Sequence, residues 1–258
     1  DPATFAAVAR AGLQTLPGDL LMFKQLEAYW NCVEIIEAEL AKGDAIPVAI
    51  GSGTINDLVK LASHRHGRPY MCVATAASMD GYTAYGASIT RDGAKQTFDC
   101  PAPRVVIADI DVIAAAPAHL TASGYADLLA KLTAGADWIV ADALGVEPID
   151  PHAWETVQTG LREALAHPIN VERLIEGLLM SGFAMQSHQS SRPASGAEHQ
   201  FSHLWEMQHA TDASHGFKVG VATVAVARFY EKLTALSADE FYAQAVPDAA
   251  LLFDANLR

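Results

Sequence analysis

Ile46 to Ala62 reads IPVAIGSGTINDLVKLA and decides the fold of the chain. Its first five residues form a short apolar run, Gly51 to Thr54 form a tight turn, and the residues from Ile55 onward favour a helix. A strand, a glycine turn and a helix in this order are the unit of a parallel sheet. Bare backbone in such a turn lets N–H groups approach a diphosphate at the start of the helix. The stretch lacks the third glycine of the GxGxxG pattern, so an ordinary strand-to-helix turn explains it equally well.

Two further short apolar runs, Tyr70–Ala74 and Val105–Ala108, predict strands of the same sheet. Strands that are apolar on both faces and alternate with helices indicate a parallel sheet, which binds ligands at the carboxyl ends of its strands. We expect Thr75, Ser78 and Asp80, which follow the first of these runs, at that edge. Ordinary turn and cap chemistry is the alternative explanation for all three.

Helical signals precede and follow the strands. Residues 5–43 favour a helix, and an apolar stripe recurs there at three- and four-residue steps: Leu26, Tyr29, Val33, Ile36 and Leu40. Strand signals disappear beyond Pro117, and we expect helices at 125–136, 154–166, 171–185 and 220–236. The predicted fold class is α/β plus all-α. A Rossmann-like parallel-sheet domain should occupy residues 1–115 and a helical metal-binding domain residues 116–258.

Histidines concentrate in Ser191–Lys218, which reads SRPASGAEHQFSHLWEMQHATDASHGFK. His199 and His203 are four residues apart and therefore share one helix face. Thr211–Ser214 supplies cap residues, so we expect one helix to end there and another to begin at His215. Two helices that meet at such a corner could direct His199 and His215 at one divalent ion. A third ligand has to come from elsewhere in the chain.

Two glycines in Ser191–Lys218 favour a ligand-binding site at the histidines. A single helical histidine is more often a surface or hydrogen-bonded core residue than a metal ligand. Gly196 precedes one of the candidate ligands and Gly216 follows the other. Both leave the backbone bare, as close approach to a ligand requires.

Composition narrows the function classes. The 258 residues are 51% apolar and carry a net charge of -13, so we expect a globular chain without a nucleic-acid partner. No apolar run reaches about 18 residues and the first residues resemble no signal sequence, so we expect a cytoplasmic protein without a membrane span. Cys32, Cys72 and Cys100 are scattered and fit small buried hydrophobic residues. We also expect a homo-oligomer.

Five motifs resemble a known family. They occur in the order found in sn-glycerol-1-phosphate dehydrogenases, which belong to the superfamily of glycerol dehydrogenase, iron-containing alcohol dehydrogenases and 3-dehydroquinate synthase. The motifs are GSGTINDLVK, ATAASMDGYTAYGASI, SGYADLLAKLTAGADW, SRPASGAEHQFSH and SHGFKVGVATV. The resemblance covers residues 45–230.

The resemblance implies a metal site and a substrate site. Its metal ligands fall on Asp127, His199 and His215, which suit zinc first, with nickel or iron as alternatives. It also implies that His203 and Asp80 are catalytic and, like Asp127, contact the substrate.

The resemblance further implies a nicotinamide cofactor, NAD or NADP. The nucleotide loop of the family matches four residues, and the nicotinamide side matches two more. The cofactor-binding residues are then Gly51, Gly53, Thr54, Asp57, Thr75 and Ser78. Only 50 residues precede Gly51, whereas the family has a further strand-helix-strand unit there, and an incomplete nucleotide half would weaken cofactor binding. The family motif HGE is also HGF here, with Phe217.

The implied reaction interconverts dihydroxyacetone phosphate and sn-glycerol 1-phosphate. Dehydrogenation of another polyol such as glycerol is the alternative, followed by a 3-dehydroquinate synthase-like reaction and a non-catalytic metal-binding protein. A phosphorylated substrate needs a cation, and an arginine can hold two phosphate oxygens at once. Arg192, which precedes Pro193 and lies seven residues before His199, is the predicted phosphate ligand. Lys218 is the alternative cation, and a solvated loop position is the other explanation for Arg192.

Overall fold

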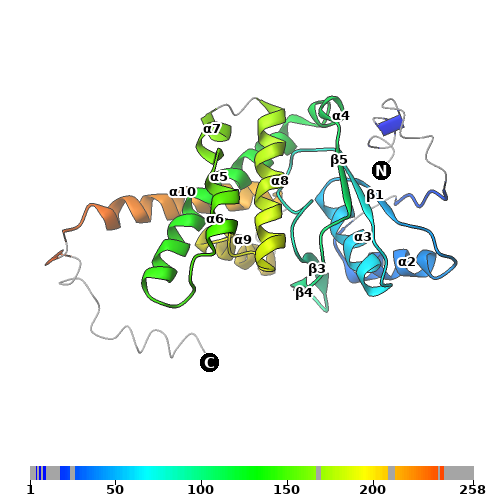
Figure 1. The fold of residues 1–258 in the computed structure, drawn as a ribbon, viewed down its shortest axis with the longest axis horizontal. Coiled ribbons are helices and arrows are strands. Elements are labelled where there is room, and N and C mark those ends of the chain that lie inside the picture. Colours follow the sequence, from blue (N-terminus) through cyan, green and yellow to red (C-terminus); the bar gives the residue numbers. More distant parts are fainter. Residues whose placement is uncertain are drawn as a thin grey trace.

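The sheet and the helical part of the chain lie on opposite sides of the molecule (Figure 1). The computed structural model describes residues 27–166, 170–208 and 213–237, together with residues 4, 6, 8, 9, 18–23, 239 and 240. Strands β1, β2 and β5 with helices α2 and α3 form one side, and α5 to α10 form the other. The predicted order, α/β first and helices afterwards, is confirmed. The division at residues 115 and 116 stays a prediction.

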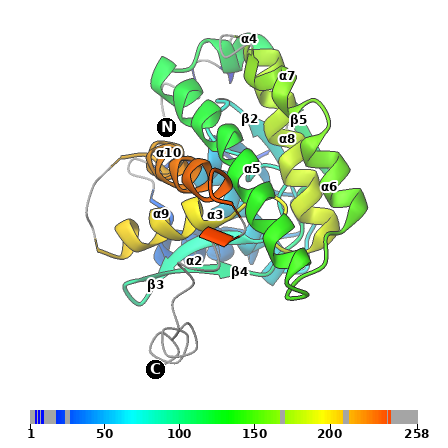
Figure 2. The same ribbon diagram turned by 90° about the vertical axis from the view of Figure 1, so that its left-hand side faces the viewer.

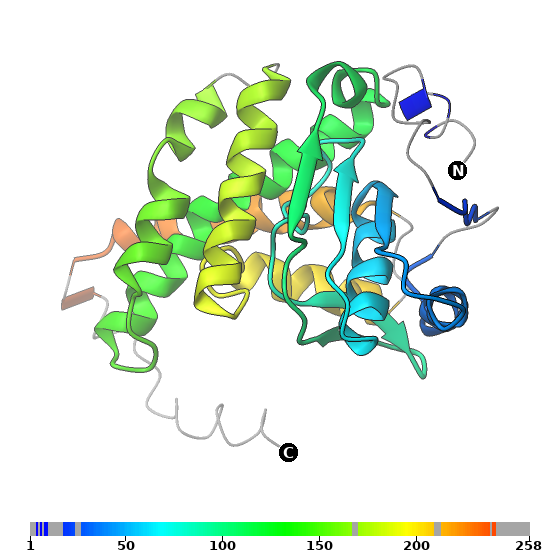
Figure 3. The same cartoon turned by 45° about the vertical axis from the view of Figure 1, so that its right-hand side comes forward.

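The central sheet is parallel, as predicted. Strands β1 (Val48–Gly51), β2 (Met71–Ala74) and β5 (Val105–Ala108) lie in the order β1-β2-β5. In the register, Gly51 is opposite Ala74, which is opposite Ala108, so the three strands end level with one another. The strands run in the same direction in Figure 3. The loops after β1 and β2 therefore leave the same edge of the sheet.

A small antiparallel hairpin accompanies this sheet and was not predicted. It consists of β3 (Ala87–Arg91) and β4 (Ala94–Phe98). Asp92 and Gly93 connect the strands with φ values of 53° and 76°. A two-residue Asp-Gly connection with both φ angles positive is a favoured hairpin turn. This dipeptide was the signal that could have revealed the hairpin.

The helices around the sheet follow the apolar stripe only in part. Helix α2 spans Trp30–Leu40 and buries Cys32, Val33, Ile36 and Leu40. Tyr29 is exposed, and Leu26 lies outside the described residues. Helix α3 (Gly53–Arg65) follows the glycine turn, and the short helix α4 (Ile110–Ala114) is capped by the Asp109 carboxylate.

The helical half contains α5 (Ala118–Ala143), α6 (Pro151–Gln158), α7 (Leu161–Ala166), α8 (Val171–His188), α9 (Ala197–Met207) and α10 (His215–Thr234). The helix predicted at 154–166 is split because Gly160 adopts a φ of 76°. Helix α10 begins at His215, as predicted, while residues 209–212 lie outside the described part of the chain. Figure 2 shows α10 beside α5 and α9.

One apolar core joins the sheet to the helices. It includes Val33 of α2, Leu58 of α3 and Cys72 of β2 together with Leu128 of α5 and Leu178 of α8. All three cysteines are free and buried, which agrees with their expected role as small hydrophobic residues. Among the described residues, no helix is long and apolar enough to cross a membrane.

Candidate metal centre and cofactor turn

Asp127, His199 and His215 meet where three helices come together. They lie on α5, α9 and α10, and one ligand atom from each residue is within 4.8 Å of the others. His199 Nε2 is 3.6 Å from Asp127 Oδ1, and the centroids of the two imidazole rings are 5.4 Å apart. One carboxylate and two imidazoles form a donor set suited to zinc, nickel or iron. The structure thus brings together the three residues predicted as metal ligands.

Small residues let the three helices approach this closely. A Cβ atom on Gly216 would lie 2.0 Å from the Ser123 carbonyl oxygen of α5. A Cβ atom on Gly196 would lie 2.9 Å from Ala134 Cα and 2.4 Å from an oxygen of Asp137 on the same helix. Both glycines were expected to leave room for a ligand. Their bare backbone instead faces α5, because α9 and α10 begin against that helix.

Glu198 holds His199 in position. Its Oε1 atom is 2.9 Å from His199 Nδ1, and its carboxylate also accepts bonds from Gly196 N (2.7 Å) and Thr133 Oγ1 (2.8 Å). Although burial raises the pKa of Glu198, the bond to His199 lowers it below its ordinary value. A buried carboxylate behind one ring nitrogen leaves the other, Nε2, to face Asp127. Carboxylates of this kind commonly orient metal-binding histidines.

The second imidazole has an unsatisfied nitrogen. His215 Nδ1 is buried without a hydrogen-bond partner among the described residues, and Glu206 Oε1 lies 3.8 Å away. Burial is the largest cause that lowers the pKa of His215, which favours the neutral ring that binds metals. A neutral His215 ring within 4.8 Å of ligand atoms of Asp127 and His199 fits a divalent ion.

Lys131 links the candidate metal centre to the loop after β2. Its Nζ atom lies 2.9 Å from Asp127 Oδ1 and 2.7 Å from Asp80 Oδ2. Asp80 also donates its backbone N–H to Asp127 Oδ2 at 3.1 Å and accepts a bond from Ser181 Oγ at 2.8 Å. Burial lowers the pKa of Lys131, but the charges of Asp127 and Asp80 outweigh it and raise that pKa. Asp80 therefore lies beside Asp127, near the predicted metal ligands. Lys131 was not identified from the sequence.

The exposed side of the group carries a second charged cluster. Glu206 of α9 is 2.6 Å from Lys95 Nζ of β4 and 2.9 Å from Lys218 Nζ of α10. His203, one turn after His199, has its Nδ1 atom 3.7 Å from Glu206. Burial raises the pKa of Glu206, yet the neighbouring histidines and Lys95 hold it well below its usual range. Of these residues, His203 and Lys218 were singled out from the sequence, whereas Lys95 and Glu206 were missed.

Arg192 lies between α8 and α9 and contacts α5 away from the metal group. Its Nη2 atom donates to the Asp137 carbonyl at 3.2 Å, and its Nε atom is 3.0 Å from Glu147 Oε2. Asp137 follows Asp127 by ten residues, which corresponds to about 15 Å along the helix. The structure does not bring Arg192 to the metal group. Lys218, the alternative cation, does lie beside it.

The glycine turn after β1 is closely packed. Gly51 has a φ of 156°, and a Cβ atom there would lie 2.4 Å from Ile55 Cγ2. A Cβ atom on Gly53 would lie 2.3 Å from Met79 Cε. Thr54 is in the first turn of α3, whose N-cap residue Ser52 makes no side-chain cap bond. Ile55 and Met79 therefore pack against the two glycines, and the approach of a diphosphate to this turn stays a prediction.

Polar residues of α3 fasten the loop that follows β2. Lys60 Nζ donates to the carbonyl oxygens of Gly81 (3.0 Å), Ala84 (2.8 Å) and Gly86 (2.9 Å). Asp57 Oδ2 accepts from the Ser88 N–H at 3.1 Å, and burial raises the Asp57 pKa. Asp57 thus has a structural role in the described chain, and its cofactor contact stays a prediction. Lys60 was missed, although a lysine among Leu58, Val59 and Leu61 signals a buried ammonium.

The remaining predicted cofactor residues lie at the carboxyl end of β2. Thr75 donates its backbone N–H to the Gly51 carbonyl at 3.2 Å, which joins the loops after β1 and β2. The Ser78 carbonyl accepts a 3.2 Å bond from Ser123 Oγ of α5. Both side chains are largely buried at the sheet edge where they were expected. Their cofactor contacts stay predictions.

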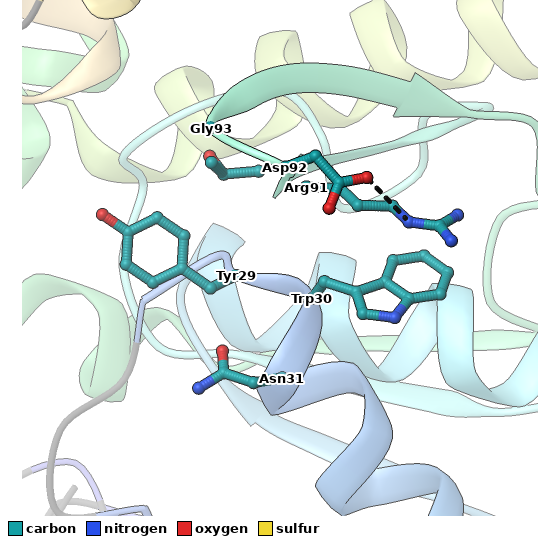
Figure 4. Close-up of a pocket in the computed structure, with 7 residues that line it drawn as sticks. Tyr29, Trp30, Asn31, Arg91, Asp92 and Gly93 are labelled. Carbon is teal, nitrogen blue, oxygen red and sulfur yellow. Dashed lines mark ion pairs between the residues drawn. The ribbon is translucent and has the colours of Figure 1, made fainter.

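A separate pocket of about 380 Å³ lies between the start of α2 and the β3–β4 hairpin (Figure 4). Tyr29, Trp30, Asn31 and residues 90–93 line it. Arg91 stacks 4.0 Å from the centroid of the Trp30 ring, and Arg65 approaches the same ring at 4.9 Å. Cation–π packing accounts for these contacts. None of the predicted catalytic, metal-binding or cofactor-binding residues lines this pocket.

The fold and the first part of the chain are similar to those of iron-containing alcohol dehydrogenases. Residues 8–117 match the family model of iron-containing alcohol dehydrogenase. A probable glycerol dehydrogenase from Sinorhizobium meliloti 1021 has a similar structure, with a TM-score of 0.64 and 20% identity. The similarity covers 92% of this chain and 70% of that one, and it shows a shared fold.

Two relatives with higher sequence identity are glycerol-1-phosphate dehydrogenases. The glycerol-1-phosphate dehydrogenase [NAD(P)+] of Halalkalibacterium halodurans is 37% identical over 219 residues, which cover 80% of this chain and 55% of that protein. The enzyme of the same name from Pyrococcus horikoshii is 37% identical over 210 residues, covering 78% and 61%. The chain therefore spans little more than half the length of these relatives. The matches confirm the resemblance to the glycerol-1-phosphate dehydrogenase family that the five motifs indicate.

Proposed function

We propose that the chain carries the active site of a metal-dependent NAD(P)-linked dehydrogenase that interconverts dihydroxyacetone phosphate and sn-glycerol 1-phosphate. The observation that carries this proposal is the convergence of Asp127, His199 and His215 from three helices. The names of the relatives support the substrate and the cofactor. A divalent ion bound by the three residues supplies the Lewis acidity that polarises a hydroxyl or carbonyl group.

The surrounding residues orient the ligands and handle protons. Glu198 fixes the His199 ring, and Lys131 with the Asp80 N–H keeps the Asp127 carboxylate in place. Asp80 lies in the loop after β2, where it can contact both the substrate and Lys131. His203 has a side chain that is 38% exposed and is well placed to exchange a proton between the substrate and solvent.

The cofactor is proposed to lie along Gly51–Thr54, with its diphosphate at the start of α3. Thr75 and Ser78, on the neighbouring loop, would then face the nicotinamide. This placement agrees with the general position of ligands at the carboxyl ends of parallel strands. A nicotinamide held by these residues would supply the hydride chemistry of the reaction.

Metal content and turnover of single variants test the proposed centre. Asp127→Ala, His199→Ala and His215→Ala should each lose the bound ion and the oxidation of sn-glycerol 1-phosphate. His203→Ala is the matched control, because it should retain the ion and lose rate. Atomic-absorption analysis of the purified variants gives the metal content independently of activity. Stoichiometric metal in His199→Ala would rule out the assignment.

The cofactor turn needs a paired test because Gly53 packs against Met79. Gly53→Val should weaken NAD(P)H binding, measured by fluorescence titration, without release of the metal. Met79→Ala in the same chain removes the thioether that the new side chain would meet. Weak binding in the double variant supports a diphosphate that approaches the turn. Restored binding would show that Gly53 serves only to accommodate Met79.

A further inference from the structure

Two lysines from distant parts of the sequence hold the two oxygens of one carboxylate. Lys95 Nζ of β4 lies 2.6 Å from Glu206 Oε2, and Lys218 Nζ of α10 lies 2.9 Å from Glu206 Oε1. Figure 2 shows β4, α9 and α10 in one region of the molecule, and α9 contacts both of the other elements. Each ammonium group therefore pairs with a different oxygen of the Glu206 carboxylate.

This cluster has an excess of positive charge. Two ammonium groups share one carboxylate, whereas the lone ammonium of Lys131 is shared by the carboxylates of Asp80 and Asp127. Lys95 is partly exposed, with 26% of its side chain accessible, whereas Lys218 is largely buried, with 10% accessible. A cationic cluster that reaches solvent through Lys95 attracts an anion, even in a chain of net charge -13.

The cluster lies at a suitable distance from the metal group. Glu206 Oε1 is 3.8 Å from His215 Nδ1, so one carboxylate separates the ammonium groups from a proposed metal ligand. Lys218 also follows His215 by one turn of α10, which places the two residues on the same helix face. A three-carbon substrate could reach both places, whereas Arg192 contacts Asp137 farther along α5 and Glu147 beyond the end of that helix.

We propose that Lys95 and Lys218 bind the phosphate group of the substrate, at the end opposite the carbon that reacts. This inference rests on the proposed function. Each lysine offers a charge-assisted N–H bond to a different phosphate oxygen. Glu206 holds the two ammonium groups in position in the absence of substrate. The phosphate then joins the cluster and neutralises its excess charge.

Calorimetric titration of the full metal-loaded chain with inorganic phosphate and with sn-glycerol 1-phosphate tests the inference. Lys95→Gln and Lys218→Gln should each weaken the binding of both ligands by about tenfold or more, since each removes a charge-assisted bond. Lys218→Arg, which keeps the charge, should restore most of the affinity. Arg192→Ala and Lys42→Gln are matched controls and should change affinity by less than about twofold. Metal content should stay stoichiometric in every variant.

Several outcomes would overturn the inference. They are wild-type phosphate affinity in both lysine variants, a larger loss in Arg192→Ala, or an equal loss of kcat/KM for glycerol and for sn-glycerol 1-phosphate. Weaker NAD(P)H binding with unchanged sn-glycerol 1-phosphate binding would assign the lysines to a cofactor phosphate. If the wild-type chain binds inorganic phosphate through these lysines but neither binds nor oxidises sn-glycerol 1-phosphate, the proposed function fails and the anion site stands.

Discussion

Lys131 is the residue on which the buried charges of the site depend. It is fully buried and neutralises Asp127 and Asp80, which lie 2.9 and 2.7 Å from its ammonium group. Lys131→Met should destabilise the metal-free protein by about 3 to 5 kcal/mol, because it leaves two buried carboxylates without a counter-charge. A divalent ion should recover part of this loss by supplying positive charge to Asp127. Denaturant unfolding in the presence of chelator and of zinc measures both effects.

The exposed pair Lys42–Glu39 provides the control for Lys131. Its N–O distance of 2.6 Å is similar, but 68% of the Lys42 side chain and 45% of the Glu39 side chain are exposed. Lys42→Met should therefore change the free energy of unfolding by less than about 1 kcal/mol. A similar loss in both variants would mean that burial of the carboxylates is not the cause.

The cysteines should be unreactive in the folded chain. Burial raises the pKa of both Cys72 and Cys100 to about 12, and Cys32 is buried as well. The thiolate is the reactive form, so few of these groups react near neutral pH. Iodoacetamide should label all three thiols after denaturation and almost none before it, as measured by intact mass. Rapid labelling of one thiol in the native protein would contradict its burial.

At the scale of helices, Gly216 sets the distance between α10 and α5. The Cβ atom of Gly216→Ala would lie 2.0 Å from the Ser123 carbonyl oxygen, so the start of α10 has to move away. We expect a loss of about 1 to 3 kcal/mol in stability. His215 would move with it, so zinc affinity should fall as well. Gly43→Ala, which meets nothing within 4 Å, is the control, and equal zinc affinities in the two variants would contradict the expectation.

The boundaries of elements were predictable where the local chemistry is strong. The run Val105–Ala108 agrees with the expected strand because apolar patterning acts locally. Helix α10 begins at His215 as expected, although its N-cap residue Ser214 bonds to Ser123 and makes no cap bond. The turn at Asp92-Gly93 is an equally local signal for the β3–β4 hairpin. The split at Gly160 could not be read from periodicity, since the residues on both sides favour a helix.

At the scale of the molecule, the bound ion should protect both halves of the chain. Asp80 follows a strand of the sheet, yet it bonds to Lys131 and Asp127 of α5, and the apolar core is continuous across the halves. A ligand present at 100 times its Kd adds about 2.7 kcal/mol to the stability of the state that binds it. Zinc should therefore slow hydrogen exchange in β2 and α3 as well as in α5. Slowing confined to α5, α9 and α10 would show that the halves open independently.

Contacts between residues far apart in the sequence could not be predicted. Lys95 and Glu206 are separated by 111 positions and come from different halves of the chain. Nothing local to either residue marks them as partners, because a lysine on a strand and a glutamate on a helix are ordinary surface residues. The metal ligands were identified by their positions in family motifs. Such motifs give the identity and order of residues, but no distances between them. The role of Gly216 shows the same limit, because its neighbour Ser123 lies on another helix.

The burial of Lys60 and Lys131 has a practical consequence for handling the protein. Amine-directed reagents attack neutral, accessible amino groups, and both of these ammonium groups are enclosed and bonded. Lys42, by contrast, is exposed at the end of α2, on the sheet side of the molecule and away from the helical half. Amine-directed modification of the folded chain should therefore label Lys42 and leave Lys60 and Lys131 unmodified.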